Sequence, residues 1–279
     1  MITSLTGRTR HLYNKLINRE VGLYLNGYTA FRLKKIDGLG PVKNHVTTVA
    51  TPLEPGGVFL SSKAEERNLV LTVEFAMENA EGSTVAELRQ NLYSVFSPGN
   101  KIDIIIEDNE LGTLTIDGRV ETTEPTIFTQ DPTVMISIIC PYPYFKLVAP
   151  RTVYVVPPGN FPMFNVPFSS NVPTGFVFEA DVAIDNDYFL LHGEPRINTN
   201  YIGLSGFQLL VGDHIRLSTV KGDRSATYIR SASTQSVLGY LTGSLSDTKL
   251  VDGDNYFRLN EHSRLSNVKF SYDRFYNGL

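Results

Sequence analysis

The chain has 279 residues, a formal net charge of −4 and a sequence pI near 5.8. Its hydrophobic fraction of 42% supplies enough apolar material for one or two cores, and the length favours two domains. The mild acidity argues against a general nucleic-acid binder, which would carry a basic surface. We therefore expect no sequence-specific nucleic-acid partner.

Cys140 is the single cysteine, which excludes an intrachain disulfide and a cysteine zinc site. It ends the apolar run Val134–Cys140, so we expect a buried small hydrophobic residue rather than a nucleophile. Residues 1–20 carry several basic residues but no apolar signal-peptide segment, and no apolar run approaches the ~20 residues needed to cross a bilayer. These features indicate a protein made and folded in a cytoplasm, without a membrane partner.

Strand patterns dominate the first half of the chain. Leu69–Phe75 alternates apolar and polar residues and predicts a strand with one buried face. Residues 114–121 alternate in the same way, with Gly118 where a bulge or a close approach would fit. Lys101–Ile106 and Val134–Cys140 are more continuously apolar and indicate central strands.

One helix interrupts these strands. Thr84 and Glu87 form a capping box, and an apolar stripe follows at helical spacing, in Val85, Leu88, Leu92 and Val95. Ser97-Pro98-Gly99 ends the helix. We interpret it as an amphipathic helix that covers one face of a sheet.

A proline-rich segment marks the domain boundary. Residues 141–173 contain eight of the fifteen prolines, and proline removes hydrogen-bond donors from a β-ladder. We interpret the segment as an extended connector. The prediction is an α+β domain at 1–150, with a short N-terminal arm, and an all-β domain at 151–279. Short strands near Val177, Ile215–Leu217 and Val268–Tyr272 belong to the second domain.

No recognised catalytic or metal-binding motif is present. The histidines are far apart in the sequence (His11, His45, His192, His214, His262) and form no metal-ligand pair. Gly38-Leu39-Gly40-Pro41 lacks the third glycine of a dinucleotide loop. Asp185-Asn186-Asp187 and Asp252-Gly253-Asp254-Asn255 lack the spacing of a calcium loop and are interpreted as turns. We expect no catalytic residues, no cofactor and no metal.

Sugar binding is the alternative function for the second domain, because β-sandwiches often bind carbohydrates. The chain has no tryptophan, the largest aromatic platform. Tyrosines could replace it, namely Tyr188, Tyr201, Tyr228 and Tyr240. Tyrosines in strands are more often half-buried packing residues, which favours an architectural role.

Several segments, in this order, resemble the distal tail (Dit) proteins of long-tailed phages. In the first domain they are Ile36–Pro41, Glu54–Gly57, Glu66–Leu71, Phe96–Gly99 and Ile139–Phe145. In the second they are Gly212–Thr219, Gly222–Ala226 and the closing strand Val268–Leu279. The resemblance covers roughly residues 22–279.

The resemblance implies a mainly β protein without enzymatic activity. Its first domain, a β-sandwich or barrel with one helix, would form a homohexameric ring around a lumen for DNA. Its second would be a peripheral galectin-like or carbohydrate-module-like β-sandwich. The implied partners are the tail tube protein, the tail-associated lysin or hub protein, the tape measure and receptor-binding proteins, all at the tail tip of a virion. The equivalent hub protein of a contractile tail or of a phage-derived tail particle is an alternative identity.

Overall fold

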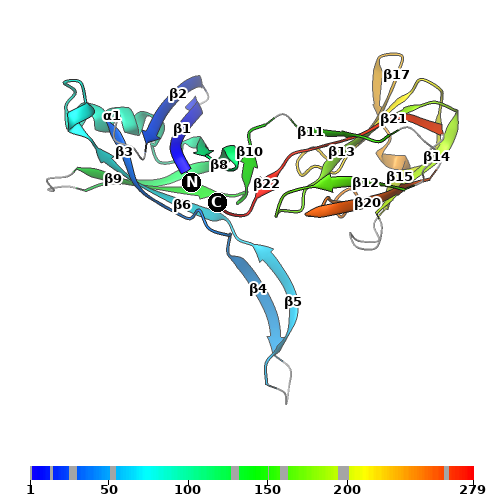
Figure 1. The fold of residues 1–279 in the computed structure, drawn as a ribbon, viewed down its shortest axis with the longest axis horizontal. Helices are drawn as coiled ribbons and strands as arrows, with labels where there is room; N and C mark the ends of the chain where they lie inside the picture. Colours follow the sequence, from blue (N-terminus) through cyan, green and yellow to red (C-terminus); the bar gives the residue numbers. More distant parts are fainter. Residues whose placement is uncertain are drawn as a thin grey trace. The chain divides into compact units, whose positions relative to one another are not determined.

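The protein is mainly β, as the sequence predicts. The computed structural model describes residues 2–12, 15–24, 30–50, 55–126, 132–149, 151–157, 163–193, 201–260 and 264–279 (Figure 1). The chain forms two compact units. Unit 1 comprises Met1–Ala149 and Tyr276–Leu279, and unit 2 comprises Pro150–Phe275.

Unit 1 is built on a nine-stranded sheet that closes on itself. The long strand β8 (Gly112–Pro125) pairs with β7 (Lys101–Asp108) through its first half and with β9 (Thr133–Cys140) through its second. The order is β22-β10-β8-β7-β1-β2-β3-β6-β9, so the β8–β9 pairing makes a barrel. The other strands are β1 (Ile2–Leu12), β2 (Lys15–Tyr24), β3 (Phe31–Asp37), β6 (Arg67–Phe75), β10 (Phe145–Leu147) and β22 (Phe275–Tyr276).

The predicted strands of unit 1 bury the expected faces. Leu69, Leu71 and Val73 on β6 are fully buried, as the alternation predicts. At Gly118 on β8, an added Cβ would lie 2.6 Å from Ile138 Cγ2 and 3.0 Å from the Cys140 sulfur. The close approach predicted at this glycine is therefore confirmed, and it lets β8 approach the neighbouring strand β9 closely.

The N-terminal residues do not form a separate arm, so that prediction is wrong. Strand β1 pairs antiparallel with both β2 and β7, which places it inside the nine-stranded sheet. Leu5 and Leu23 are fully buried in the core of unit 1. The sequence of β1 shows no clear alternation of apolar and polar residues, because most of its positions carry small, polar or basic side chains.

The predicted helix is confirmed as α1 (Val85–Val95). The Thr84 hydroxyl accepts from the Glu87 backbone N–H at 3.3 Å, and the Glu87 carboxylate accepts from the Thr84 N–H at 2.8 Å. Leu88, Leu92 and Val95 are buried in the core that the strands of unit 1 line. A short 3₁₀ helix, η1 (Met77–Asn79), precedes α1.

Unit 2 is a sandwich of two antiparallel sheets around one core rich in phenylalanine. The six-stranded sheet has the order β11-β21-β13-β16-β17-β18, and the five-stranded sheet β12-β20-β14-β15-β19. The strands are β11 (Thr152–Val155), β12 (Met163–Phe168), β13 (Phe176–Val182), β14 (Asn186–Gly193), β15 (Tyr201–Leu209), β16 (His214–Ser218), β17 (Ser225–Arg230), β18 (Ser233–Ser236), β19 (Leu241–Gly243), β20 (Gly253–Leu259) and β21 (Leu265–Tyr272). A short 3₁₀ helix, η2 (Leu238–Tyr240), precedes β19.

The proline-rich segment is more than a connector. It supplies β10 to unit 1, and β11 and β12 to one edge of each sheet of unit 2. An edge strand needs ladder hydrogen bonds on one side only, so β12 tolerates Pro167 opposite Asp254. The proline rule excluded central strands correctly and did not exclude edge strands.

The assignment of residues 151–279 to one domain is corrected at the chain end. Tyr276–Leu279 belongs to unit 1, where β22 lies beside β10. The Leu279 N–H donates to the Leu39 carbonyl at 3.0 Å. Backbone pairing, which the apolar pattern does not reveal, brings this segment back to unit 1.

Thr84→Ala is expected to lower the free energy of unfolding of unit 1 by about 1 kcal/mol, because it removes the capping side chain of α1. Ser94→Ala is the matched control, since Ser94 lies on the same helix and bonds only the Asn91 carbonyl. The control should stay within about 0.5 kcal/mol of wild type. Chemical denaturation of the full chain measures both, and equal stabilities would contradict the capping role.

Candidate interaction surfaces

Arg67, the first residue of β6, holds together loops from distant parts of the sequence. Its side chain is 4% exposed. The guanidinium donates to the carbonyls of Pro143 and Gly40, each at 2.7 Å, and also to those of Gly38 and Asn277. Burial lowers the pKa of Arg67, and Cys140 and Tyr144 act in the opposite direction. We call this cluster the Arg67 junction.

Two further contacts fix the geometry of the Arg67 junction. The guanidinium carbon lies 4.6 Å from the centre of the Phe145 ring, a cation–π contact. Gly38 has a φ of +90°, and a Cβ there would lie 2.0 Å from the Asn68 carbonyl oxygen. Glycine is therefore required at this turn for a structural reason.

The Arg67 junction gathers segments that the sequence analysis treated separately. Ile36–Pro41, Glu66–Leu71, Ile139–Phe145 and the closing strand were four pieces of one resemblance, and all contribute to it. An arginine at the start of an apolar strand was the available sequence signal. Its partners are backbone carbonyls, which leave no sequence signature.

A long hairpin forms the most exposed part of unit 1. Strands β4 (Asn44–Ala50) and β5 (Gly57–Ala64) pair only with each other and project away from the barrel (Figure 1). All residues of β4 are exposed, and all of β5 but the last. Five apolar side chains are more than half exposed, namely Val46, Val49, Val58, Phe59 and Leu60. We call β4 and β5 the arm.

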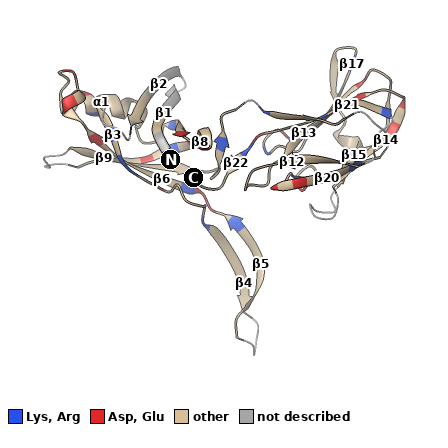
Figure 2. Cartoon of the chain, in the orientation of Figure 1, with Lys and Arg blue, Asp and Glu red and all other residues tan. Residues whose placement is uncertain are grey.

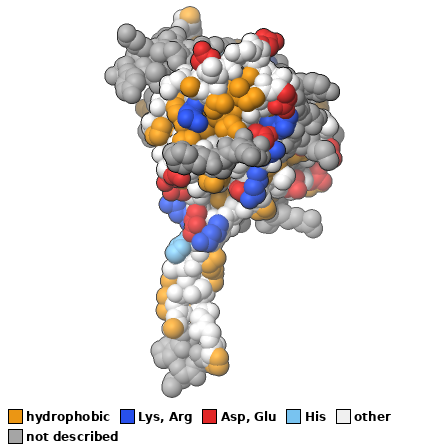
Figure 3. Space-filling model, turned by 90° about the vertical axis from the view of Figure 1, so that its left-hand side faces the viewer, with side chains coloured by type: hydrophobic (Ala, Val, Ile, Leu, Met, Phe, Trp, Pro, Cys, Tyr) orange, Lys and Arg blue, Asp and Glu red, His pale blue; other side chains and the backbone are white. Residues whose placement is uncertain are grey.

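The described part of the arm carries charged side chains only at its base, next to the barrel. Residues 46–50 and 55–62 include no charged side chain. Charged side chains gather where the arm meets the barrel, as Figures 2 and 3 show. There Lys43 pairs with Glu65 at 3.7 Å. An open pocket of about 450 Å³ is lined by His45, Lys63, Ala64, Glu65, Glu66 and Pro141.

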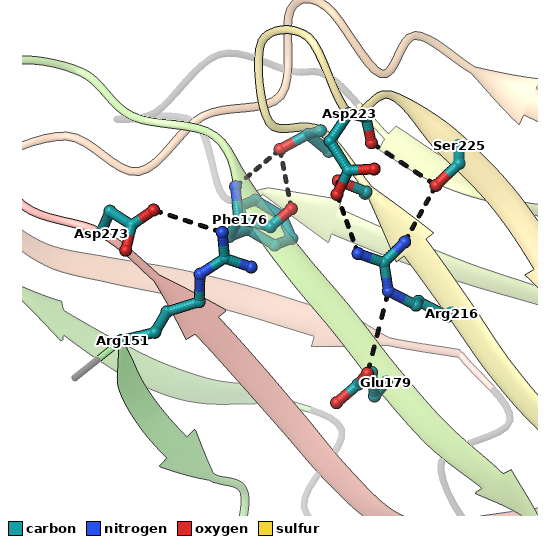
Figure 4. A network of polar contacts seen from close by, with 9 residues as sticks. Arg151, Phe176, Glu179, Arg216, Asp223, Ser225 and Asp273 are labelled. Atoms are coloured by element: carbon teal, nitrogen blue, oxygen red, sulfur yellow. Dashed lines mark hydrogen bonds and ion pairs between the residues drawn. The ribbon is translucent and has the colours of Figure 1, made fainter. Parts of the chain in front are cut away.

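The outer face of the six-stranded sheet carries a network of polar contacts (Figure 4). Arg216 on β16 donates to Asp223 at 2.8 Å and to the Ser225 hydroxyl at 3.0 Å. Its Nε lies 3.9 Å from Glu179 on β13. Nearby, Arg151 pairs with Asp273 at 3.3 Å. Both of these arginines therefore have carboxylate partners.

A second polar cluster closes the turn before β16. Asp213 is 2% exposed, and its carboxylate accepts from Arg230 at 2.8 and 2.6 Å. It also accepts from the Leu210 N–H at 2.9 Å. The pKa of Asp213 is lowered, mainly by the hydrogen bonds from Arg230. The carboxylate therefore stabilises the folded state in its charged form.

Cys140 lies in the core, as predicted. It is fully buried, and burial raises the pKa of its thiol to about 12. A thiol in that state is a poor nucleophile. Among the described residues, no cluster of three or more His, Cys, Asp or Glu side chains could hold a metal ion. No described helix is long and apolar enough to cross a membrane.

The acidic turns form structural hydrogen bonds, as interpreted from sequence. Asn255 bonds both the N–H and the carbonyl of Val251, each at 2.8 Å. The side-chain Oδ1 of Asn186 accepts from the Tyr188 N–H at 3.1 Å. His214 lies 2.7 Å from Asp181. His262 and the side chain of His11 lie outside the described residues.

The four tyrosines considered for sugar binding differ in environment. Tyr228 is buried and donates to Gln235 at 3.0 Å, and Tyr188 is partly buried on β14. Tyr201 and Tyr240 are exposed. The four tyrosines therefore do not form a single cluster. The centre of the Tyr240 ring lies 5.1 Å from that of the Phe207 ring.

The fold defines a class of protein: a barrel with one helix and a hairpin arm, joined in one chain to a β-sandwich. Comparison of the sequence with protein-family models and with curated proteins yields no match. Comparison of the structure with solved structures does.

The structure is similar to that of the Dit protein of phage SPP1, described as a paradigm of the hub of the adsorption apparatus in phages that infect Gram-positive bacteria. The TM-score is 0.66 at 11% sequence identity, and the match covers 97% of this chain and 98% of that chain. A chain of the phage p2 baseplate in its activated conformation with Sr matches with a TM-score of 0.48 at 10% identity, over 98% of each chain. The predicted resemblance to distal tail proteins is confirmed at the level of the fold.

Arg67→Met is expected to destabilise unit 1 by about 3 kcal/mol, because it leaves buried carbonyl oxygens without donors. The matched control is Arg119→Met, whose guanidinium makes one exposed bond to the Gly99 carbonyl. Chemical denaturation combined with amide hydrogen exchange would measure each unit separately. Equal protection of unit 1 in both variants would contradict the role of the junction.

Asp213→Asn is expected to destabilise unit 2 at neutral pH and to flatten its pH dependence. Since the folded-state pKa of Asp213 is lowered, its contribution is complete above the unfolded-state pKa and disappears as the pH falls through the folded-state value. Thermal unfolding of wild type and variant from neutral to strongly acidic pH would measure this. Asp187→Asn, at an exposed position on β14, is the control. Parallel pH profiles for wild type and Asp213→Asn would contradict the assignment.

Proposed function

We propose that this chain is a structural, non-enzymatic subunit of a phage tail tip or baseplate. The observation that carries the proposal is the fold likeness to a Dit hub protein, which extends over nearly the whole of both chains and so includes both units. A virion protein with a mechanical role requires no catalytic centre. The buried, unreactive Cys140 agrees with that role.

In its finer form, the proposal is a homohexameric hub ring. Unit 1 would form the ring and continue the tail tube, while unit 2 would lie at the periphery. The ring would bind the tail tube protein on one side and the tail-associated lysin or hub protein on the other, with the tape measure and receptor-binding proteins as further partners. DNA would pass through the lumen, and the net charge of −4 would avoid the retention of phosphates.

The arm supports contact between copies of the chain. An isolated two-stranded hairpin is marginally stable in water, and this one has apolar side chains exposed on both faces. Exposed apolar patches and open strand edges are typical of interaction sites. In a closed ring each subunit presents one surface and receives another, so a neighbouring copy would cover the arm.

Light scattering and electron microscopy of the purified full chain, alone and co-expressed with the tail tube protein, test the ring. The proposal predicts a hexamer with a central opening in at least one of the two preparations. A monomer in both preparations at high concentration would contradict it.

Val58→Asp is expected to abolish or strongly weaken the ring, because it places a charge in an uncharged interface. Val153→Asp is the matched control, since Val58 is 57% exposed and Val153, on β11 of unit 2, is 54% exposed. Both variants should keep the wild-type circular dichroism spectrum. If Val58→Asp assembles as well as Val153→Asp does, the arm is not part of the ring interface.

A further inference from the structure

The outer face of the five-stranded sheet carries a row of side chains in register across four strands. Met163 on β12 lies opposite Arg258 on β20. Arg258 lies opposite His192 on β14, and His192 lies opposite Tyr201 on β15. All four point outward, because their described neighbours with side chains are buried in the core, namely Phe164, Leu191, Ile202, Phe257 and Leu259. We call these four residues the Tyr201 row.

The groups of the Tyr201 row are accessible. Tyr201 is 40% exposed and Met163 is 52% exposed. The His192 and Tyr201 rings lie 5.7 Å apart at an angle of 42°, so they do not cover one another as a parallel stack would. Among the described residues Arg258 has no ion-pair partner, and besides the Tyr201 ring His192 contacts Asn260 at 3.5 Å.

The two outer faces of the sandwich therefore differ in what they leave available. On the six-stranded sheet, Arg216 is paired with Asp223, and Arg151 with Asp273 (Figure 4). A ligand would have to break those pairs. On the five-stranded sheet, a guanidinium and two rings are available without that cost. Tyr256, 41% exposed, adds another ring on the same face, two residues before Arg258 on β20.

This combination matches the chemistry of a pyranose sugar. One side of a pyranose ring presents C–H groups, which pack against the electron-rich face of an aromatic ring. Its hydroxyls accept hydrogen bonds from a guanidinium. With an imidazole they can act either as donors or as acceptors. Tyr201 supplies the first kind of contact, while Arg258 and His192 supply the second.

The shape of the row favours a chain molecule. Neighbouring strands lie about 4.8 Å apart, so the row is roughly 14 Å long and one side chain wide. The strand spacing is close to the length of one pyranose residue. A protein partner would need a much broader contact than this single line. We propose that the Tyr201 row binds a linear oligosaccharide of neutral pyranose residues, laid across the strands of unit 2.

The proposal concerns unit 2 alone and does not depend on the ring. It sharpens the carbohydrate alternative considered from the sequence. Of the tyrosines considered there, it uses only Tyr201, and it adds Arg258, His192 and Met163. A failure to bind sugar would leave the hub proposal intact, and a failure to form a ring would leave the sugar site intact.

Binding of the full chain to an array of linear oligosaccharides of glucose, galactose, rhamnose and N-acetylglucosamine tests the site. The best ligand on the array is then titrated against wild type, Tyr201→Ala and Arg258→Ala. Each variant is expected to bind about tenfold more weakly or worse, since each removes one ring or one donor group. Arg224→Ala, an exposed arginine in the turn before β17, is the matched control for Arg258→Ala and should bind like wild type.

Thermal unfolding separates loss of binding from loss of fold, because the exposed positions should leave the melting temperature unchanged. Absence of binding by wild type to every oligosaccharide on the array would overturn the proposal and favour a face reserved for a protein neighbour. Binding that persists unchanged in both Tyr201→Ala and Arg258→Ala would overturn it as well, since the sugar would then lie elsewhere.

Discussion

Burial of one guanidinium organises the part of unit 1 from which the arm and the chain end depart. A buried charge is costly unless hydrogen bonds saturate it, and the planar guanidinium carries five donors in a fixed fork. Arg67 meets that requirement with backbone carbonyls from the Gly38–Gly40 turn, the Pro143 turn and Asn277. The same bonds satisfy carbonyls that no β-ladder reaches. One side chain therefore sets the root of the arm and the return of the C-terminal segment.

The two units expose surface in different ways. In unit 1, closure of the sheet through β8 and β9 removes two barrel edges, so the arm concentrates the open edges and the exposed apolar groups. Unit 2 instead keeps edge strands, and the difference between its outer faces is chemical. On one face Arg216 is paired with Asp223, and on the other Arg258 and Tyr201 are exposed. An assembly contact at the arm and a ligand contact on the sandwich are physically compatible.

The proline-rich segment shows how a correct local rule led to an incomplete topology. Proline interrupts a ladder, and β12 accepts Pro167 because only β20 pairs with it. The error at the N-terminus had the opposite origin. There, basic and polar residues concealed β1, which is held in the sheet by ladders on both sides and by a few buried residues such as Leu5. In both cases pairing with distant strands outweighed local composition.

The sequence by itself determined the β-rich class, the α1 helix with its Thr84 cap, the buried face of Leu69–Phe75 and the inert burial of Cys140. These features depend on residue spacing within one element, so alternation and capping chemistry reveal them. Only the tertiary structure decided that the barrel closes, that Tyr276–Leu279 joins unit 1, that Arg67 gathers four segments and that Tyr201, His192 and Arg258 form a row. Those features depend on strand register and on backbone carbonyls, which every residue carries and which therefore leave no mark in the amino-acid sequence.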